Sequence, residues 1–232
     1  MKTSILARED CILAAAEKTL AIIEKKPEAV VALSAGEDEL ALLRKLARLA
    51  DERGVSLAGL RLFAACELEG LKRGDPRSAA FRIAESLFGD KAAAAVASPD
   101  GARCADYDRA IASAGGIDLA ILGLGANARV AFNEPATPYD SHTHVQKLTK
   151  TTRAALAPVF GGEEAVPERG VTLGFQELCA ARKILVIALG EEKKRAVYHL
   201  LYGRDDSVYP AAFLQLPRNV SVFADHQAAA DL

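Results

Sequence analysis

The segment GLGANARVAFNEP, residues 123–135, carries the most distinctive arrangement of polar residues in the chain. It continues an apolar run that predicts a buried strand over 117–125. Ligands of α/β proteins bind where such strands end, so groups that move protons are expected in this turn. The turn offers Asn127, Arg129 and Glu134. Only Glu134 can take up and release a proton, because an amide does not titrate and a guanidinium stays protonated.

Three further strand ends carry polar residues: Ser34 to Glu37, Cys66 to Glu69 and Gly190 to Lys193. The carboxyl ends of parallel strands lie along one edge of a sheet, so these ends and the 123–135 turn are expected to form one cleft. Each has a plainer interpretation too. The first is a capped helix start, the second contains a buried structural thiol, and the third is a helix start with solvated charges.

The elements that position these ends follow from alternating helical and strand periodicity. Helices are predicted over 8–25, 37–54, 78–88, 105–116, 151–160 and 191–203, and strands over 29–34, 60–65, 117–125, 183–190 and 219–225. Residues 92–98 fit a strand or a helix end, 66–77 a polar loop, and 130–170 is otherwise irregular. Strands separated by helices predict an α/β fold in a single domain, 1–232, as a Rossmann-like three-layer α/β/α sandwich with a mostly parallel sheet.

Composition narrows the class of protein. The chain has 232 residues, half of them hydrophobic, and a net charge of −2, which does not indicate nucleic-acid or membrane binding. The cysteines Cys11, Cys66, Cys104 and Cys179 are widely spaced, so neither a zinc site nor a disulfide framework is expected. No signal peptide is evident, and a cytoplasmic protein without metal or cofactor is predicted. Whether it forms a homo-oligomer stays open.

The 123–135 segment resembles the signature G-x-G-x-D-G-H-x-A-F-N-E-P of the glucosamine-6-phosphate deaminase/isomerase and 6-phosphogluconolactonase superfamily, in its deaminase form. Three more stretches resemble the deaminases: THVQKLTKTTR (143–153), the segment 166–197, and AAFLQLPRNVSVFAD (211–225). The resemblance covers nearly the whole chain. It implies a sugar-phosphate isomerase fold, a place in amino-sugar phosphate metabolism and a small anionic or sugar-phosphate ligand. Coenzyme A transferases, ribose-5-phosphate isomerases and sugar-sensing regulators fit less well.

Carried over by position, the resemblance shows several substitutions among catalytic residues. Cys66 and Asn127 stand where the family has aspartates, and Arg129 stands where it has the ring-opening histidine, whereas Glu134 and Glu67 match family acids. The acids that follow Cys66, Glu67 and Glu69, raise a thiol pKa, which favours a structural role. We expect Arg129 and Glu134 to form a bidentate ion pair that fills the sugar-ring volume.

The substrate-binding positions that the resemblance implies are Ser34, Gly36, Gly125, Arg153 and Lys193. The family's phosphate turn, T-G-G-T-P, reads SAGEDEL here and keeps only one glycine. Ser34 and the glutamate three residues later predict a capping box at the helix start, with acids that repel a phosphate. Two other family positions, a substrate arginine and a histidine, hold Pro158 and Pro217.

Two functions from different classes remain. The first is a deaminase-like protein of carbohydrate metabolism that has lost the standard reaction, a pseudoenzyme that binds a ligand or partner. The alternative is an active sugar-phosphate isomerase, deaminase or lactonase with rearranged residues or a different substrate, built with Glu67, Glu69, His142, His144 or Lys193. Histidines in a loop with His-x-His spacing are a weak metal signal.

Overall fold

The computed structural model describes residues 1–72, 74–89, 96–204 and 208–232, and within them it is built on a parallel sheet. The strand order is β1-β10-β9-β6-β2-β3-β5. The strands of this sheet are β1 (Lys2–Leu6), β2 (Val30–Leu33), β3 (Arg61–Ala64), β5 (Val96–Ala97), β6 (Leu119–Gly123), β9 (Ile184–Ala188) and β10 (Val220–Asp225). Every neighbouring pair is parallel. The predicted α/β fold with a mostly parallel sheet is therefore confirmed.

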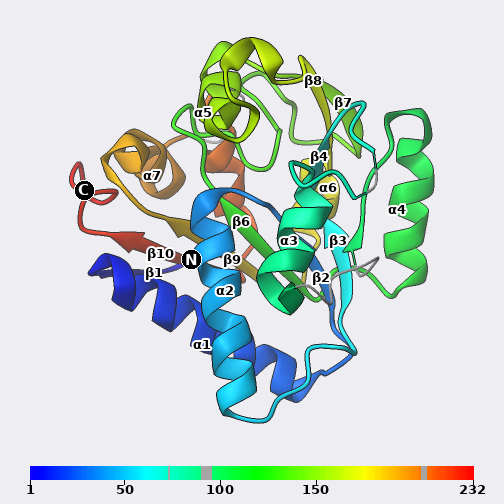
Figure 1. Cartoon of the computed structure of the whole chain (residues 1–232). Helices are drawn as coiled ribbons and strands as arrows, with labels where there is room; N and C mark the ends of the chain where they lie inside the picture. The colour runs from blue at the N-terminus through cyan, green and yellow to red at the C-terminus, as the bar shows by residue number, and fades with distance from the viewer. Residues whose placement is uncertain (73, 90–95, 205–207) are drawn as a thin grey trace.

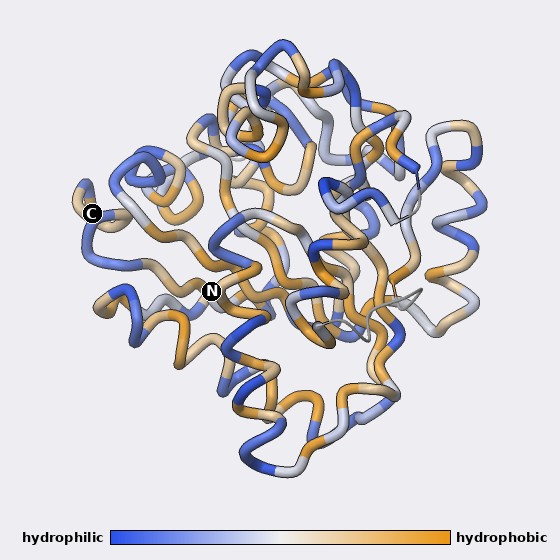
Figure 2. The backbone as a smooth tube through the Cα atoms, viewed as in Figure 1, coloured by the Kyte–Doolittle hydropathy of each residue, from blue (hydrophilic) through white to orange (hydrophobic). Residues whose placement is uncertain are grey.

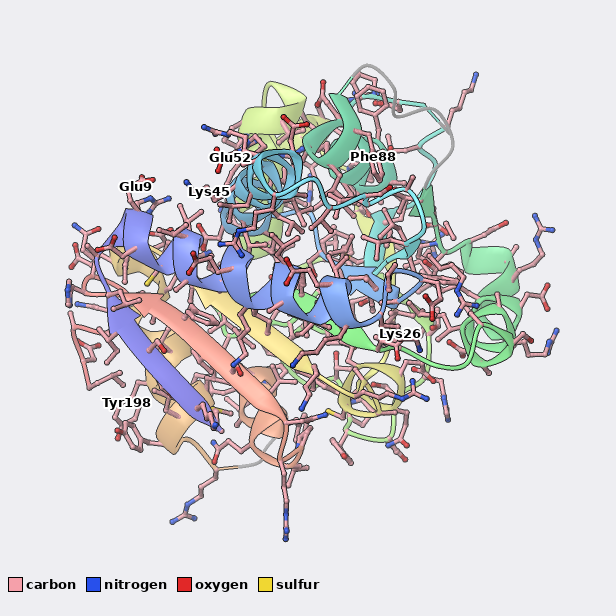
Figure 3. The ribbon with its side chains drawn as sticks, turned by 90° about the horizontal axis from the view of Figure 1, so that it is seen from below. Glu9, Lys26, Lys45, Glu52, Phe88 and Tyr198 are labelled. Atoms are coloured by element: carbon pink, nitrogen blue, oxygen red, sulfur yellow. The ribbon has the colours of Figure 1, made fainter. Side chains whose placement is uncertain are left out.

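Helices cover both faces of this sheet, because alternate side chains of the central strands enter two separate apolar cores. One core packs against α1 (Arg8–Lys25), α2 (Glu37–Glu52) and α3 (Ala79–Phe88). The other packs against α4 (Cys104–Ser113), α6 (Phe175–Cys179) and α7 (Lys194–Tyr202). Figure 2 shows the hydrophobic residues gathered on the central strands. In Figure 3, α1 runs along one side of β1 and β10, and the labelled Tyr198, which belongs to α7, lies on the other side of these strands.

A second, antiparallel sheet stands beside the carboxyl ends of the main sheet, and the sequence did not indicate it. Its order is β4 (Cys66–Leu68), β8 (Arg169–Thr172) and β7 (His144–Lys147). The expected loop over 66–77 thus begins as a strand, and the irregular 130–170 region holds two more strands beside α5 (Lys150–Phe160). These strands have three or four residues, and β7 is partly exposed throughout, so they lack a run of apolar residues.

Other departures from the predicted elements are small. Strand β1, at the edge beside β10, was missed because its KTSIL sequence is mostly exposed. The ambiguous 92–98 stretch ends in β5, while 92–95 lie outside the described residues. Short 3-10 helices occupy Gly101–Arg103 (η2), Glu163–Ala165 (η3), Glu191–Lys193 (η4) and Pro210–Gln215 (η5). Across the described ranges, we find no helix both long and apolar enough to cross a membrane.

Candidate functional site

A cavity of about 380 Å³ lies where β2, β3, β6 and β9 end, on the side of the small sheet and α5. The four segments expected to converge all contribute to its wall. The predicted positions found in that wall are Ser34, Gly36, Cys66, Glu67, Gly125, Asn127, Arg129 and Lys193. Glu134 and Arg153 do not line it, whereas Glu39, Asp38, Arg77 and Arg82 do, and these four had not been singled out as binding residues.

Cys66 opens β4 and lies buried beneath the cavity. Burial raises the pKa of its thiol to about 12, and the acids Glu67 and Glu39 raise it further against the opposing charge of Arg129. The thiol is therefore protonated at neutral pH and is neither base nor nucleophile. Where the resemblance places a proton-transferring aspartate, this chain holds an inert side chain.

Glu67 is buried next to Cys66, and its carboxylate is engaged by the start of α3. Its Oε1 accepts hydrogen bonds from the N–H groups of Leu68 (2.8 Å) and Ala79 (3.0 Å). Its Oε2 accepts from the N–H of Ala80 and from the hydroxyl of Ser98, both at 3.2 Å. A carboxylate that accepts four hydrogen bonds, two of them from N–H groups of a helix start, serves there as a cap.

Glu134 is almost fully buried and belongs to a network with Asn127 and Thr149. Asn127 donates from Nδ2 to Glu134 Oε2 at 2.7 Å. The backbone N–H of Thr149 donates to Glu134 Oε1 at 3.1 Å. The hydroxyl of Thr149 donates to Glu134 Oε2, also at 3.1 Å. Thr149 in turn caps α5 by accepting from the N–H of Thr152. The retained family glutamate thus holds α5 against the 123–135 turn.

The predicted Arg129–Glu134 ion pair is wrong. Arg129 donates from Nη1 to the carbonyl of Ala131, and its guanidinium lies over the ring of Phe132, 5.6 Å from the centroid. Among the described residues it forms no ion pair with a carboxylate. Because Asn127 and Thr149 already satisfy Glu134, the guanidinium turns toward the cavity. Its charge lowers the pKa of Cys66 and of Glu39 against the stronger effect of burial.

The backbone of this turn explains the direction of Arg129. Ala128 and Ala131 both have positive φ, 62° and 52°, a conformation that costs a non-glycine residue about 1–2 kcal/mol. At Gly125, an added Cβ would lie 2.4 Å from Cγ of Arg129, so only glycine leaves room for this side chain. Residues 127 and 129 are therefore held by a strained turn whose glycine is indispensable.

The predicted capping box at the start of α2 is also wrong. The N-cap residue is Gly36, no side chain caps the helix, and Ser34 Oγ is buried without a hydrogen-bond partner among the described residues. Glu37 points outward and forms ion pairs with Arg82 and Arg44. The N-cap lies two residues after Ser34, so Ser34 is too early in the chain to cap the free N–H groups.

Glu39 takes the place that an anion would occupy at this helix start. It is buried, and the backbone N–H groups of Gly36 and of Glu39 itself face its carboxylate. An added Cβ at Gly36 or Gly123 would lie 2.6 or 2.3 Å from its Oε2. Burial raises the pKa of Glu39, although the charges of Lys193 and Arg129 oppose the shift. The chain supplies its own carboxylate where the family binds phosphate.

Asp38 and Lys193 complete the charged wall. Burial and the neighbouring Glu39 raise the pKa of Asp38 to about 6, while a hydrogen bond from the N–H of Leu189 and the charges of Lys193 and Arg8 oppose this shift. Lys193, in η4, therefore faces two buried carboxylates from across the cavity. Arg129 adds a second cation to the same space.

The remaining predicted residues lie apart from the cavity. Arg153 donates to the carbonyl of Glu163 at 2.8 Å and ties α5 to η3. Glu69 pairs with Arg169 across the small sheet. His142 and His144 line a separate, open hollow of about 440 Å³ next to residues 135–138. No sequence signal marked Glu39, because an acid in a first helical turn is ordinary.

Comparisons with known proteins agree over nearly the whole chain. A family model described as glucosamine-6-phosphate isomerases/6-phosphogluconolactonase matches residues 6–223. The glucosamine-6-phosphate deaminase of Beutenbergia cavernae is 38% identical over 221 residues, 91% of this chain and 85% of that protein. That of Mycolicibacterium smegmatis is 37% identical over 226 residues, 93% of this chain and 86% of that protein.

Solved structures show the same likeness. The structure of a monomeric glucosamine-6-phosphate deaminase superposes with a TM-score of 0.94 at 31% identity, with both chains fully covered. The 6-phosphogluconolactonase from Trypanosoma brucei superposes with a TM-score of 0.75 at 21% identity over all of this chain and 98% of that one, a likeness of fold alone.

Proposed function

Because the chain belongs to the glucosamine-6-phosphate isomerase/6-phosphogluconolactonase family, we propose that it binds a small amino-sugar phosphate-like ligand in the strand-end cavity without carrying out the deaminase reaction. Relatives named glucosamine-6-phosphate deaminase support the ligand class. The substituted wall of the cavity supports the loss of the reaction. Family membership by itself does not decide activity, since function depends on the site.

One observation carries this proposal: the three positions that should move protons hold Cys66, Asn127 and Arg129. The thiol has a pKa of about 12, the amide does not titrate, and the guanidinium stays protonated. The two retained acids, Glu67 and Glu134, are occupied by hydrogen bonds that hold α3 and α5. Each missing general acid or base typically costs 10²–10⁴-fold in rate, so the combined loss removes useful turnover.

The charges of the cavity also define how a ligand would lie in it. The carboxylate of Glu39 closes the helix start to phosphate, while Arg129 and Lys193 form a cationic side. A ligand with one anionic group would direct it toward these two cations. An ammonium or hydroxyl group would then meet Glu39 and the hydroxyl of Ser34, which has no hydrogen-bond partner within the described part of the chain. A cavity of about 380 Å³ is within the size range of small-molecule sites.

Calorimetric titration and an ammonia-release assay with glucosamine 6-phosphate test the proposal together. We expect saturable binding and no ammonia release. Arg129→Ala should weaken binding by tenfold or more, because one charge-assisted contact is worth about 1.5–3 kcal/mol. Arg48→Ala removes the same charge from an exposed position of α2 outside the cavity and should change nothing. Turnover near 10 per second, the ordinary value for enzymes, would refute the loss of activity.

The alternative, an active enzyme with rearranged residues, is favoured by a different observation. Glu39 is a buried carboxylate with a raised pKa in the cavity wall, and such groups are candidate bases. If Glu39 were the base, any turnover of a sugar phosphate by the wild type would disappear in Glu39→Gln. A wild type inactive on a panel of hexose and pentose phosphates removes this alternative.

A further inference from the structure

Outside the cavity, three side chains from distant parts of the sequence converge at one point. Asp108 comes from α4, His142 from the loop after the 123–135 turn, and Glu177 from α6. One ligand atom of each lies within 4.8 Å of those of the other two. Nδ1 of His142 lies 2.6 Å from Oε1 of Glu177. Helices α4 and α6 lie on the same side of the main sheet (Figure 1).

The chemistry around these atoms is not satisfied by the protein alone. Oε2 of Glu177 is buried and has no hydrogen-bond partner among the described residues. Asp108 is contacted by the hydroxyl of Thr143. Two carboxylates and one imidazole therefore lie together, and His142 engages one oxygen of Glu177 while the other oxygen is left over.

We propose that Asp108, His142 and Glu177 bind a divalent transition-metal ion, with Zn²⁺ as the probe. An imidazole and two carboxylates are a common ligand set for such ions, and the imidazole disfavours Mg²⁺ and Ca²⁺, which prefer oxygen alone. Ligand atoms held at about 2.1 Å around a tetrahedral ion lie about 3.4 Å apart. The exposed His142 and half-exposed Asp108 can reach this spacing by side-chain rotation, which opens the 2.6 Å contact between His142 and Glu177 and shortens the longer distances.

The site would have a structural consequence. The ion would fasten α4 and α6 to the loop that carries His142 and lines the outer hollow. The three ligands could not be grouped from the sequence, because more than thirty residues separate each from the next, and the weak His-x-His signal pairs His142 with His144 rather than with Asp108 and Glu177. His144 instead faces the carbonyl of His142 and the amide of Gln146.

Equilibrium dialysis of the full chain against Zn²⁺ at pH 7.5, with the thiols kept reduced, tests the site. We expect one saturable Zn²⁺ per chain and a rise in the thermal midpoint with added Zn²⁺. His142→Ala and Asp108→Asn should each weaken Zn²⁺ binding more than about tenfold. Loss of a residue that only supports a metal ligand typically lowers metal affinity about tenfold or more, and these two residues are ligands themselves. Glu177→Gln should do the same.

The control is His226→Ala, which removes an exposed histidine from another part of the surface and should leave binding intact. A second control, His144→Ala, distinguishes the proposed three-residue site from a site built on His142 and His144. This variant should also bind Zn²⁺ as the wild type does. Because positions 108 and 142 are not buried, their variants decide the matter even if Glu177→Gln fails to fold. Absence of saturable binding, or binding that survives His142→Ala, overturns the proposal.

Discussion

The side-chain amide of Asn127 makes the buried Glu134 stable, because it donates a hydrogen bond where the family has a second carboxylate. Two carboxylates at that separation share a proton or need a cation between them. Position 129, where the family has a histidine, holds an arginine that is turned toward the cavity. No side chain at this position could therefore place a positive charge between carboxylates at 127 and 134. The substitutions at 127 and 129 are thus mutually consistent, and reversing only one of them leaves an unfavourable arrangement.

Asn127→Asp should therefore destabilise the protein. The new carboxylate would lie about as close to Glu134 as the amide does, 2.7 Å. At a distance of about 4 Å and an effective dielectric of about 20, such repulsion is worth about 4 kcal/mol, and uptake of a proton relieves part of it. We expect the free energy of unfolding to fall by about 2–4 kcal/mol at pH 8 and by less at pH 5, measured by urea unfolding.

Ala126→Asp is the matched control for this variant. It adds the same charge at an exposed position one residue earlier and should change stability by less than about 0.5 kcal/mol. If the two variants have equal stability at pH 8, Asn127 is not paired with Glu134 in solution.

Residue-level prediction from the sequence succeeded for Cys66 and failed for Arg129. The inert thiol was expected from neighbouring acids, and the structure gives burial as the larger cause. The Arg129–Glu134 pair was inferred from spacing along the turn. The number of residues between them does not determine where the two side chains point. Ala128 and Ala131 adopt positive φ and change the direction of the chain within this turn.

At the scale of the element, the first turn of α2 replaces a bound anion with side chains of its own. The helix dipole favours acids there, and Glu37, Asp38 and Glu39 supply three. Two of them are buried, at a cost that the helix start and Lys193 only partly offset. This turn should therefore contribute a measurable pH dependence to stability.

Asp38→Asn tests that dependence. The folded pKa of Asp38, about 6, lies above its ordinary value of 3.8, so between those values the folded chain holds a proton that the unfolded chain has released. Its contribution to stability consequently falls as pH rises through this window and stays low above it. The variant should gain up to about 3 kcal/mol over the wild type at pH 7.5 and almost nothing at pH 4.

Chemical unfolding at several pH values measures this difference. Glu37→Gln changes an exposed acid of the same helical turn and should give a curve parallel to that of the wild type. A stability difference for Asp38→Asn that does not vary with pH would show that the carboxylate is ionised throughout.

The main helices and strands were predictable because each carries a long periodic or apolar pattern. Helix α1 lies over 8–25 as expected, and β9, with the sequence ILVIA, is buried along its length. The small sheet was not predictable, since strands such as β4 and β7 gain their stability from pairing with β8 rather than from local sequence. Strand β4 of that sheet, with α5, contributes to the wall of the cavity.

At the scale of the whole molecule, the fold and the site are held by different residues. The two apolar cores lie between the main sheet and its helices, and they include few of the polar residues that line the cavity. Substitution of the proton-transfer positions therefore leaves the family fold intact, in keeping with a TM-score of 0.94 to a deaminase. The fold was predictable from patterns, whereas the state of the site required coordinates.

This separation allows the family chemistry to be rebuilt in steps on an unchanged scaffold. The triple variant Cys66→Asp, Asn127→Asp, Arg129→His restores the proton-transfer groups that the resemblance implies. We expect it to release ammonia from glucosamine 6-phosphate at less than about a hundredth of an ordinary turnover of 10 per second. The reason is that the side chain of Glu39 still occupies the helix start where the resemblance places the phosphate.

Adding Glu39→Ala to the triple variant should then lower KM at least tenfold, because it frees the backbone N–H groups of the helix start, which the Glu39 side chain occupies, to bind a phosphate. Adding Glu52→Ala instead removes an exposed acid from the far end of α2, outside the cavity, and KM should not change. Steady-state kinetics of the two quadruple variants make the comparison. If the triple variant alone turns over near 10 per second, or both quadruple variants share one KM, Glu39 does not block the phosphate position.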